Sequence, residues 1–251
     1  MKQYGLIGFP LSHSFSKKYF TEKFDRENIP DARYDLFPIE SVSELPELLK
    51  QHPDLLGLNV TIPHKLNVMA FLDRIDEDAQ KAGAVNCIRI SNENSHQLLE
   101  GFNTDVYGFE ASLQPLLKPW HQQALVLGDG GAAKAVKSVL TKLGITYKCV
   151  TRKETPGNWL FSELKPQQIA DHLLIINTTP LGTYPKVEEC PPIPYEAITS
   201  KHLLYDLIYN PEQTLFLQKG AAVGAATKNG YEMLLLQAEK SWEIWNAKDK
   251  H

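Results

Sequence analysis

The sequence predicts an α/β protein with two domains, and two observations support this prediction. Short apolar segments alternate with helical patterns along most of the 251 residues, which is typical of βαβ units. Near residue 123 the chain changes from a half rich in small polar residues to a continuous apolar segment followed by glycines, which is typical of a second, parallel sheet. At roughly 150 residues for a domain, the length corresponds to between one and two domains.

The first half of the chain is expected to alternate strands with helices. Phe20 and Phe24 lie one helical turn apart, and Leu45, Leu48 and Leu49 share one face of a second helix. Turn-forming residues at 92–95 separate two apolar segments, which predicts a hairpin. The expected strands are 4–8, 33–39, 57–62, 84–91 and 98–102, and the expected helices are 16–28, 43–51 and 64–74.

The second half predicts a parallel sheet with helical crossovers. A helix after Asp105 carries Phe109, Leu113 and Leu116 on one side. The apolar segments that follow are bounded by glycine, proline or polar residues, as buried parallel strands are. The expected strands are 123–127, 147–151, 173–177, 202–207 and 224–227, and the expected helices are 132–143 and 230–247.

Composition excludes several classes of protein. The 26 basic and 30 acidic residues give a net charge of −4, so no domain-wide positive excess favours nucleic acid as a partner. No apolar segment approaches the roughly 18 residues of a membrane span, and the start is too short for a signal-peptide core. Three cysteines without a CxxC spacing predict reduced, structural thiols. We therefore expect a cytoplasmic protein, a monomer or a homodimer, without a metal site.

A glycine-rich turn follows the strand at 123–127. Residues 128–133 read Gly-Asp-Gly-Gly-Ala-Ala and fit the pattern G-x-G-x-x-A between a strand and a helix. Glycines allow the tight turn and the approach of a pyrophosphate, and a small third residue lets helix and strand pack closely. The helix N-terminus adds unpaired N–H groups and a positive dipole end. This favours a doubly wound Rossmann domain, with a structural turn that binds no dinucleotide as the alternative.

The residues at the end of the next strand indicate which dinucleotide the domain would bind. A carboxylate that would hold the ribose of NAD is absent there, and Thr151-Arg152-Lys153 stands in its place. Two cations at this point suit the 2′-phosphate of NADP, and Arg152 could also stack on the adenine ring. A solvated charged turn is the alternative interpretation.

Small polar side chains gather at the ends of the expected strands in the first half. They belong to the segments 12–16, 59–65, 84–86 and 103–105. Ligands of open α/β sheets bind at this edge, and hydroxyl and amide groups suit a polyhydroxylated ligand. Each residue also has a structural interpretation, because Ser16, Asn103 and Asp105 could cap helices.

Lys65 and Asp105 form the candidate catalytic pair. A lysine at the head of the helix expected from residue 64 is disfavoured by the helix dipole, which weakens a purely structural explanation for Lys65. A carboxylate at Asp105 could hold the ammonium and support proton transfer.

Together these segments resemble the shikimate dehydrogenase family over nearly the whole chain. Matching stretches occur in the same order as in the family. They are 8–16, 59–65, 82–86, 103–105, 128–132, 177–182, 206–211 and 233–238.

The resemblance implies the NADPH-dependent, reversible reduction of 3-dehydroshikimate to shikimate in aromatic amino acid biosynthesis. It implies a discontinuous substrate domain, residues 1–102 with 230–251, and an NADP-binding Rossmann domain, residues 103–229. Lys65 and Asp105 would be the catalytic pair. The implied substrate residues are Ser14, Ser16, Asn59, Thr61, Lys65, Asn86, Asp105, Tyr209 and Gln237. The implied cofactor residues are Gly128, Gly130, Gly131, Ala132, Thr151, Arg152, Thr178, Gly230 and Met233.

Two positions depart from the family pattern. Lys17 stands where proline is common, and Asp129 stands in the glycine turn where alanine is usual. A dehydrogenase of the same family that accepts quinate, often with NAD, is one alternative. A binding protein that kept the fold without catalysis is another, against which the presence of both Lys65 and Asp105 argues.

Overall fold

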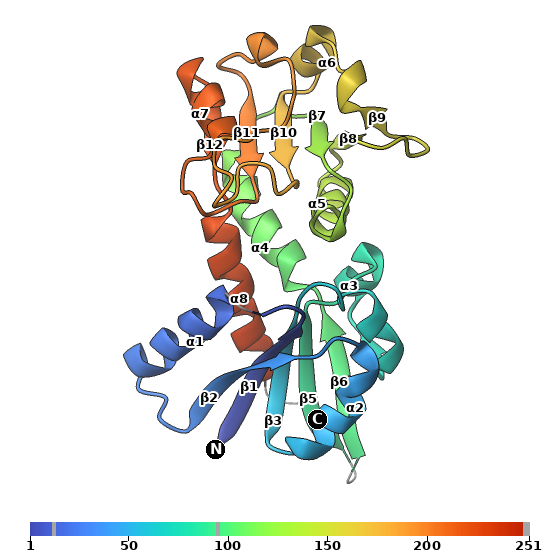
Figure 1. The fold of residues 1–251 in the computed structure, drawn as a ribbon, viewed down its shortest axis with the longest axis vertical. Coiled ribbons are helices and arrows are strands. Elements are labelled where there is room, and N and C mark those ends of the chain that lie inside the picture. Colours follow the sequence, from blue (N-terminus) through green and yellow to red (C-terminus); the bar gives the residue numbers. More distant parts are fainter. Residues whose placement is uncertain (12–13, 94–95, 248–251) are drawn as a thin grey trace. The chain divides into compact units, whose positions relative to one another are not determined.

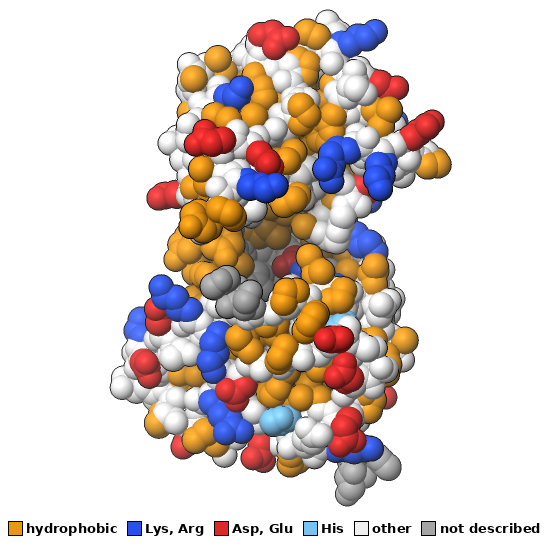
Figure 2. All heavy atoms as spheres, in the orientation of Figure 1, with side chains coloured by type: hydrophobic (Ala, Val, Ile, Leu, Met, Phe, Trp, Pro, Cys, Tyr) orange, Lys and Arg blue, Asp and Glu red, His pale blue; other side chains and the backbone are white. Residues whose placement is uncertain are grey.

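A computed structural model describes residues 1–11, 14–93 and 96–247, and it divides the chain into two compact units. The first unit comprises Met1–Thr104 and Gln237–His251, and the second comprises Asp105–Leu236. Figure 1 shows a sheet with helices in each unit, which confirms the predicted α/β class. Figure 2 shows positive and negative side chains interspersed on the visible face of each unit.

The first unit contains a mixed sheet with the order β2-β1-β3-β5-β6-β4. Strand β1 is parallel to β2 and β3, whereas β5 is antiparallel to β3 and to β6. The strands are β1 (Lys2–Gly8), β2 (Ala32–Pro38), β3 (Leu55–Val60), β4 (Arg74–Ile75), β5 (Cys87–Glu93) and β6 (His96–Phe102). The helices of this region are α1 (Phe15–Arg26), α2 (Leu45–Gln51) and α3 (Glu77–Ala82).

Each face of this sheet is covered by its own hydrophobic core. Leu45, Leu48 and Leu49 of α2 share one core with Ile7 of β1. Phe20 of α1 belongs to a second core, together with Trp245 from the last helix, α8 (Tyr231–Trp245). A side chain at Gly57 would meet Trp245 at 2.2 Å, so glycine is needed for the helix to pack this closely on β3.

The second unit contains a fully parallel sheet with the order β12-β11-β10-β7-β8-β9. Counted from its first strand, this is the order 3-2-1-4-5-6 of doubly wound dinucleotide-binding folds. The direction of winding reverses between β7 and β10, where such folds bind their ligands. The strands are β7 (Gln123–Leu127), β8 (Thr146–Thr151), β9 (Trp159–Leu160), β10 (Leu174–Asn177), β11 (Leu203–Asp206) and β12 (Ala226–Lys228).

The crossovers of this unit are helical but uneven in length. Helix α5 (Gly131–Lys142) follows the glycine turn, α6 (Pro166–Asp171) is short, and α7 (Leu215–Ala222) precedes β12. Helix α4 (Thr104–Leu113) leads into the unit. Short 3₁₀ segments lie at Val42–Glu44, Asn67–Phe71, Gln114–Leu116, Phe161–Glu163 and Tyr195–Ala197. No helix among the described residues is long and apolar enough to cross a membrane.

The prediction of a helix over 64–74 is wrong. The chain forms turns over 62–66, a 3₁₀ segment over Asn67–Phe71 and the short strand β4. Hydrogen bonds of the i to i+3 type, such as Met69 N–H to Leu66 C=O, replace the helical pattern. The buried His64 side chain meets the carbonyl oxygen of Ile39 at 2.7 Å, which anchors the start of this segment.

Candidate functional site

The glycine turn between β7 and α5 has the geometry expected of a phosphate-binding turn. Gly128 has φ = 103°, a conformation that favours glycine, and a Cβ there would lie 2.8 Å from the Thr178 hydroxyl. That hydroxyl donates a hydrogen bond to the Leu127 carbonyl at 2.8 Å. The turn is therefore held against the end of β10.

The next glycines leave room beside the helix N-terminus. A Cβ at Gly130 or Gly131 would meet no atom within 4 Å, so packing within the protein does not explain these glycines. Ala133, the small residue that ends the motif, is fully buried. The first turn of α5 contains no acidic side chain. An open, glycine-lined helix N-terminus of this kind fits the phosphates of a dinucleotide.

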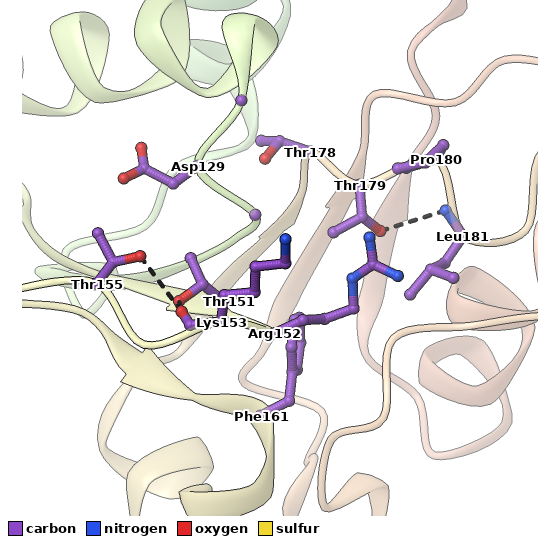
Figure 3. A pocket seen from close by; sticks show the side chains of 12 residues that line it. Asp129, Thr151, Arg152, Lys153, Thr155, Phe161, Thr178, Thr179, Pro180 and Leu181 are labelled. Carbon is purple, nitrogen blue, oxygen red and sulfur yellow. Dashed lines mark hydrogen bonds between the residues drawn. The ribbon is translucent and has the colours of Figure 1, made fainter.

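A pocket of about 440 Å³ lies at the carboxyl ends of β7, β8 and β10 (Figure 3). This volume is within the range of small-molecule sites. The pocket brings together the expected residues Gly128, Gly130, Thr151, Arg152 and Thr178. It is also lined by Asp129, Lys153, Thr155, Phe161, Thr179, Pro180 and Leu181.

The remaining expected cofactor residues lie outside this lining. Gly131 and Ala132 begin helix α5 directly beyond Gly130. Gly230 is buried against the backbone of Leu207, where a Cβ would meet the carbonyl oxygen at 2.1 Å. Met233 is buried in α8. Close packing alone thus accounts for glycine at position 230.

Two cations mark the edge of the pocket. Arg152 and Lys153 follow β8 directly, and both residues are exposed. Figure 3 shows the Arg152 side chain extending toward Thr179. The turn that carries them is organised internally, because the hydroxyls of Thr151 and Thr155 both donate to the Lys153 carbonyl, at 2.9 and 3.2 Å. The cations therefore stand on an ordered turn beside the glycine loop.

The first unit gathers the expected substrate amides into one buried network. Tyr34 donates its hydroxyl to Asn59 Oδ1 at 2.8 Å, and Asn59 Nδ2 donates to the Ser241 hydroxyl at 2.9 Å. Asn86 Oδ1 accepts from the Thr104 N–H at 2.7 Å and from its hydroxyl at 3.1 Å.

Thr104 extends this network to the last helix. Its hydroxyl oxygen lies 3.4 Å from Gln237 Oε1 and 3.3 Å from the Ser241 hydroxyl. Burial raises the pKa of Tyr34 well above its ordinary value, although a hydrogen bond with Ser16 acts in the opposite direction. Tyr34 and Ser241 were not expected from the sequence, because each contributes only through contacts with distant segments. Thr104 belongs to the polar segment 103–105 that the sequence indicates.

Other expected residues of this unit lie at the ends of β1 and β3. Ser14, rather than Ser16, caps helix α1 and accepts from the Lys17 N–H at 3.3 Å. Thr61 donates its N–H to the Ile7 carbonyl at 2.9 Å. Ser12 and His13, which belong to the same matching stretch, lie outside the described residues.

Lys65 lies in a turn and not at the head of a helix, so the dipole argument for it does not hold. Its carbonyl accepts from the Val85 N–H at 2.8 Å, which ties Lys65 to the residue before Asn86. Asp105, in the first turn of α4, and the exposed Tyr209 belong to the second unit. The pairing of Lys65 with Asp105 therefore stays a prediction.

The side chain of Lys17, which replaces the usual proline, joins α1 to β2. Its ammonium donates to the Tyr34 carbonyl and lies 3.2 Å from Asp35 Oδ1. Proline at this position could not supply this link. Among the described residues, no group of His, Cys, Asp and Glu side chains could hold a metal ion.

Comparisons with known proteins show similarity along both units of the chain. A family model described as the shikimate dehydrogenase substrate binding domain matches residues 6–88. A protein of Clostridium beijerinckii named shikimate dehydrogenase (NADP(+)) is 39% identical over 98% of this chain and 92% of its own length.

Solved structures extend the similarity to the fold of the whole chain. A chorismate mutase/shikimate 5-dehydrogenase fusion protein from Clostridium acetobutylicum has a TM-score of 0.83 and 37% identity, covering 100% of this chain and 93% of that one. The shikimate 5-dehydrogenase of Thermus thermophilus, in complex with NADP(H) and shikimate, has a TM-score of 0.82 and 28% identity, covering 98% and 94%. The chain belongs to the shikimate dehydrogenase family.

Proposed function

We propose that this protein is an NADP-dependent shikimate dehydrogenase that reversibly reduces 3-dehydroshikimate to shikimate in aromatic amino acid biosynthesis. The observation that carries the proposal is similarity along the whole chain to proteins named for this activity. A cytoplasmic location and a monomeric or homodimeric state belong to the same proposal.

The second unit is the proposed cofactor domain. Gly130 and Gly131 leave open the space at the start of α5 that phosphates would fill. Arg152 and Lys153 supply positive charge where a 2′-phosphate needs it, and Thr151 and Thr178 line the same pocket. The predicted division assigns residues 103–229 to this role. Gly230 and Met233 remain candidates for the nicotinamide side.

The first unit is the proposed substrate domain, to which the predicted division assigns residues 1–102 and 230–251. Shikimate carries a carboxylate and neighbouring hydroxyls, which need several donors and acceptors in fixed positions. Asn59, Asn86 and Gln237 are held by the buried network, so their amides are oriented before substrate binds. Ser14, Ser16 and Thr61 would add hydroxyls, and Tyr209 would approach from the cofactor domain.

Lys65 and Asp105 are the proposed catalytic pair. NADPH, when bound, supplies the hydride for the ketone carbon. Reduction leaves negative charge on the carbonyl oxygen, which the Lys65 ammonium would stabilise and then protonate. Asp105 would hold that ammonium in place. Both residues would also bind the substrate hydroxyl at the reacting carbon.

The proposal is tested by incubating the purified protein with 3-dehydroshikimate and NADPH and measuring shikimate by chromatography. Lys65→Ala is expected to lower kcat about 100-fold or more, and Asp105→Asn is expected to lower it by a comparable factor. Lys50→Ala removes an exposed lysine of α2 and serves as the control. Failure of the unmodified, folded protein to form shikimate contradicts the proposal, and normal kcat in Lys65→Ala contradicts the catalytic pair.

A further inference from the structure

The residue that departs from the family pattern in the glycine turn, Asp129, has two partners that hold its carboxylate. Oδ1 accepts from the ammonium of Lys137, two helical turns along α5. Oδ2 accepts from Nδ2 of Asn158 at 3.1 Å, and Asn158 lies at the far end of the turn that carries Arg152 and Lys153. One side chain thus joins the glycine turn, helix α5 and the loop between β8 and β9.

The negative charge of Asp129 is compensated by the neighbouring Lys137. Among the described residues that line the pocket, it supplies the one carboxylate. The side chains of Asp129 and Lys137 are only 26% and 27% exposed, so their ion pair is partly shielded from solvent. Partial burial acts to raise the pKa of Asp129, but hydrogen bonds from Lys137 and Asn158 and the charges of Lys137 and Lys134 outweigh it, and the pKa is lowered. The carboxylate is therefore ionised at neutral pH.

The orientation of the carboxylate keeps it from competing with a phosphate. Figure 3 shows Asp129 directed away from the Arg152 and Lys153 side chains. Without its two partners, the carboxylate could turn toward these cations and occupy the place of a ligand phosphate. Asn158 also donates its N–H to the Thr155 carbonyl at 3.0 Å, so its bond to Asp129 fixes one end of an ordered turn.

We propose that Asp129 is a specificity-determining residue for the adenosine end of the cofactor. Through Asn158 it positions the turn that carries Arg152 and Lys153 for a 2′-phosphate, while Lys137 cancels its charge. The inference rests on the proposed NADP-dependent function and adds residues to that site: Asp129 and Asn158 position the turn, and Lys137 neutralises Asp129.

The test measures binding of two probes, adenosine 2′,5′-bisphosphate and 5′-AMP, by titration calorimetry. Asn158→Ala removes the tether without changing charge. This variant is expected to lower the affinity for adenosine 2′,5′-bisphosphate roughly three- to tenfold, as loss of one hydrogen bond does. Its affinity for 5′-AMP should change less than about twofold. Equal effects on both probes, or no effect, would overturn the positioning role.

A second pair of variants tests the charge. Lys137→Met removes the ion-pair partner of the Asp129 carboxylate and is expected to weaken binding of both probes, that of the bisphosphate by roughly fivefold, with a smaller effect at high salt. Adding Asp129→Asn should restore binding to within about twofold, which a merely structural role of the ion pair would not produce. Lys142→Met on the same helix, whose ammonium pairs with Glu110, is the matched control. A double variant no better than Lys137→Met overturns the charge role.

These measurements do not depend on turnover of shikimate. If the probes respond as expected but shikimate is not oxidised, the cofactor inference stands and the substrate assignment fails. If the unmodified protein binds both probes equally, the inference on Asp129 is overturned whatever the substrate. Thermal melting of each variant confirms that a loss of binding does not reflect unfolding.

Discussion

Alanine substitutions at two glycines of the same turn are expected to change the free energy of unfolding in opposite directions. Gly128→Ala places a Cβ at φ = 103°, which costs about 1–2 kcal/mol in the left-handed region. The same Cβ would lie 2.8 Å from the Thr178 hydroxyl and would displace its hydrogen bond to Leu127, worth about 1 kcal/mol. Together these costs predict a loss of roughly 2–3 kcal/mol in the free energy of unfolding.

Gly131→Ala is the matched variant. Gly131 is helical and exposed, and a Cβ there meets no atom within 4 Å, so alanine should stabilise the protein by about 0.4–1 kcal/mol. The added methyl group would nevertheless occupy space that the proposal assigns to cofactor phosphates. We therefore expect a more stable protein that binds NADP at least about tenfold more weakly, a difference of roughly 1.4 kcal/mol.

Scanning calorimetry with and without NADP measures both effects. Gly128→Ala should lower Tm by roughly 5–10 °C, whereas Gly131→Ala should keep or raise it and lose at least about 1.4 kcal/mol of the stabilisation by excess NADP. An unchanged Tm for Gly128→Ala would refute the steric argument. Full stabilisation of Gly131→Ala by NADP would refute the assignment of phosphates to this helix N-terminus.

Two further predictions concern buried polar groups. Ser241→Ala should lower the free energy of unfolding in urea by about 1 kcal/mol and raise the KM for shikimate, because Asn59 Nδ2 loses the Ser241 hydroxyl at 2.9 Å and keeps the Asn86 carbonyl at 3.4 Å; an unchanged KM would separate this network from the substrate site. Burial raises the pKa of Asp206 to about 6, although Thr214, Ile208 and Asn177 donate hydrogen bonds to its carboxylate. Because the folded state holds this proton more tightly than the unfolded state, the contribution of Asp206 to the free energy of unfolding should fall by roughly 2 kcal/mol as pH rises from about 4 to about 6. Urea denaturation across this pH range should show that this decrease in the free energy of unfolding is absent from Asp206→Asn. An equal pH dependence of the free energy of unfolding in both proteins would contradict the raised pKa of Asp206.

Local signals made the cofactor unit predictable. The strand at 123–127, the glycines and helix α5 follow one another directly, so their geometry depends on neighbouring residues. Thr179, Pro180 and Leu181 line the pocket just beyond β10 and could have been included by the same reasoning. Thr155 and Phe161, which follow β8 in the chain, were not expected either. Helix α6 was harder to predict because six residues contain too little periodicity.

Long-range contacts explain what the sequence could not provide. Tyr34 and Ser241 reach Asn59 from β2 and α8, and no local pattern distinguishes them from other buried residues. At the start of the helix that was expected from residue 64, the His64 side chain contacts the Ile39 carbonyl, a partner 25 residues away that no local pattern reveals. Asp129 was visible as a departure from the family, but its partner Asn158 becomes evident only when the loop after β8 is placed beside the glycine turn.

The most direct test of the function is the initial rate of cofactor reduction, followed by absorbance, with shikimate or quinate and with NADP or NAD. We expect fast turnover with shikimate and NADP and little with quinate or NAD. Preferred turnover of quinate with NAD would contradict the assignments of substrate and of Arg152. Absence of turnover with all four combinations, in folded protein that binds NADP, would contradict the proposed dehydrogenase activity.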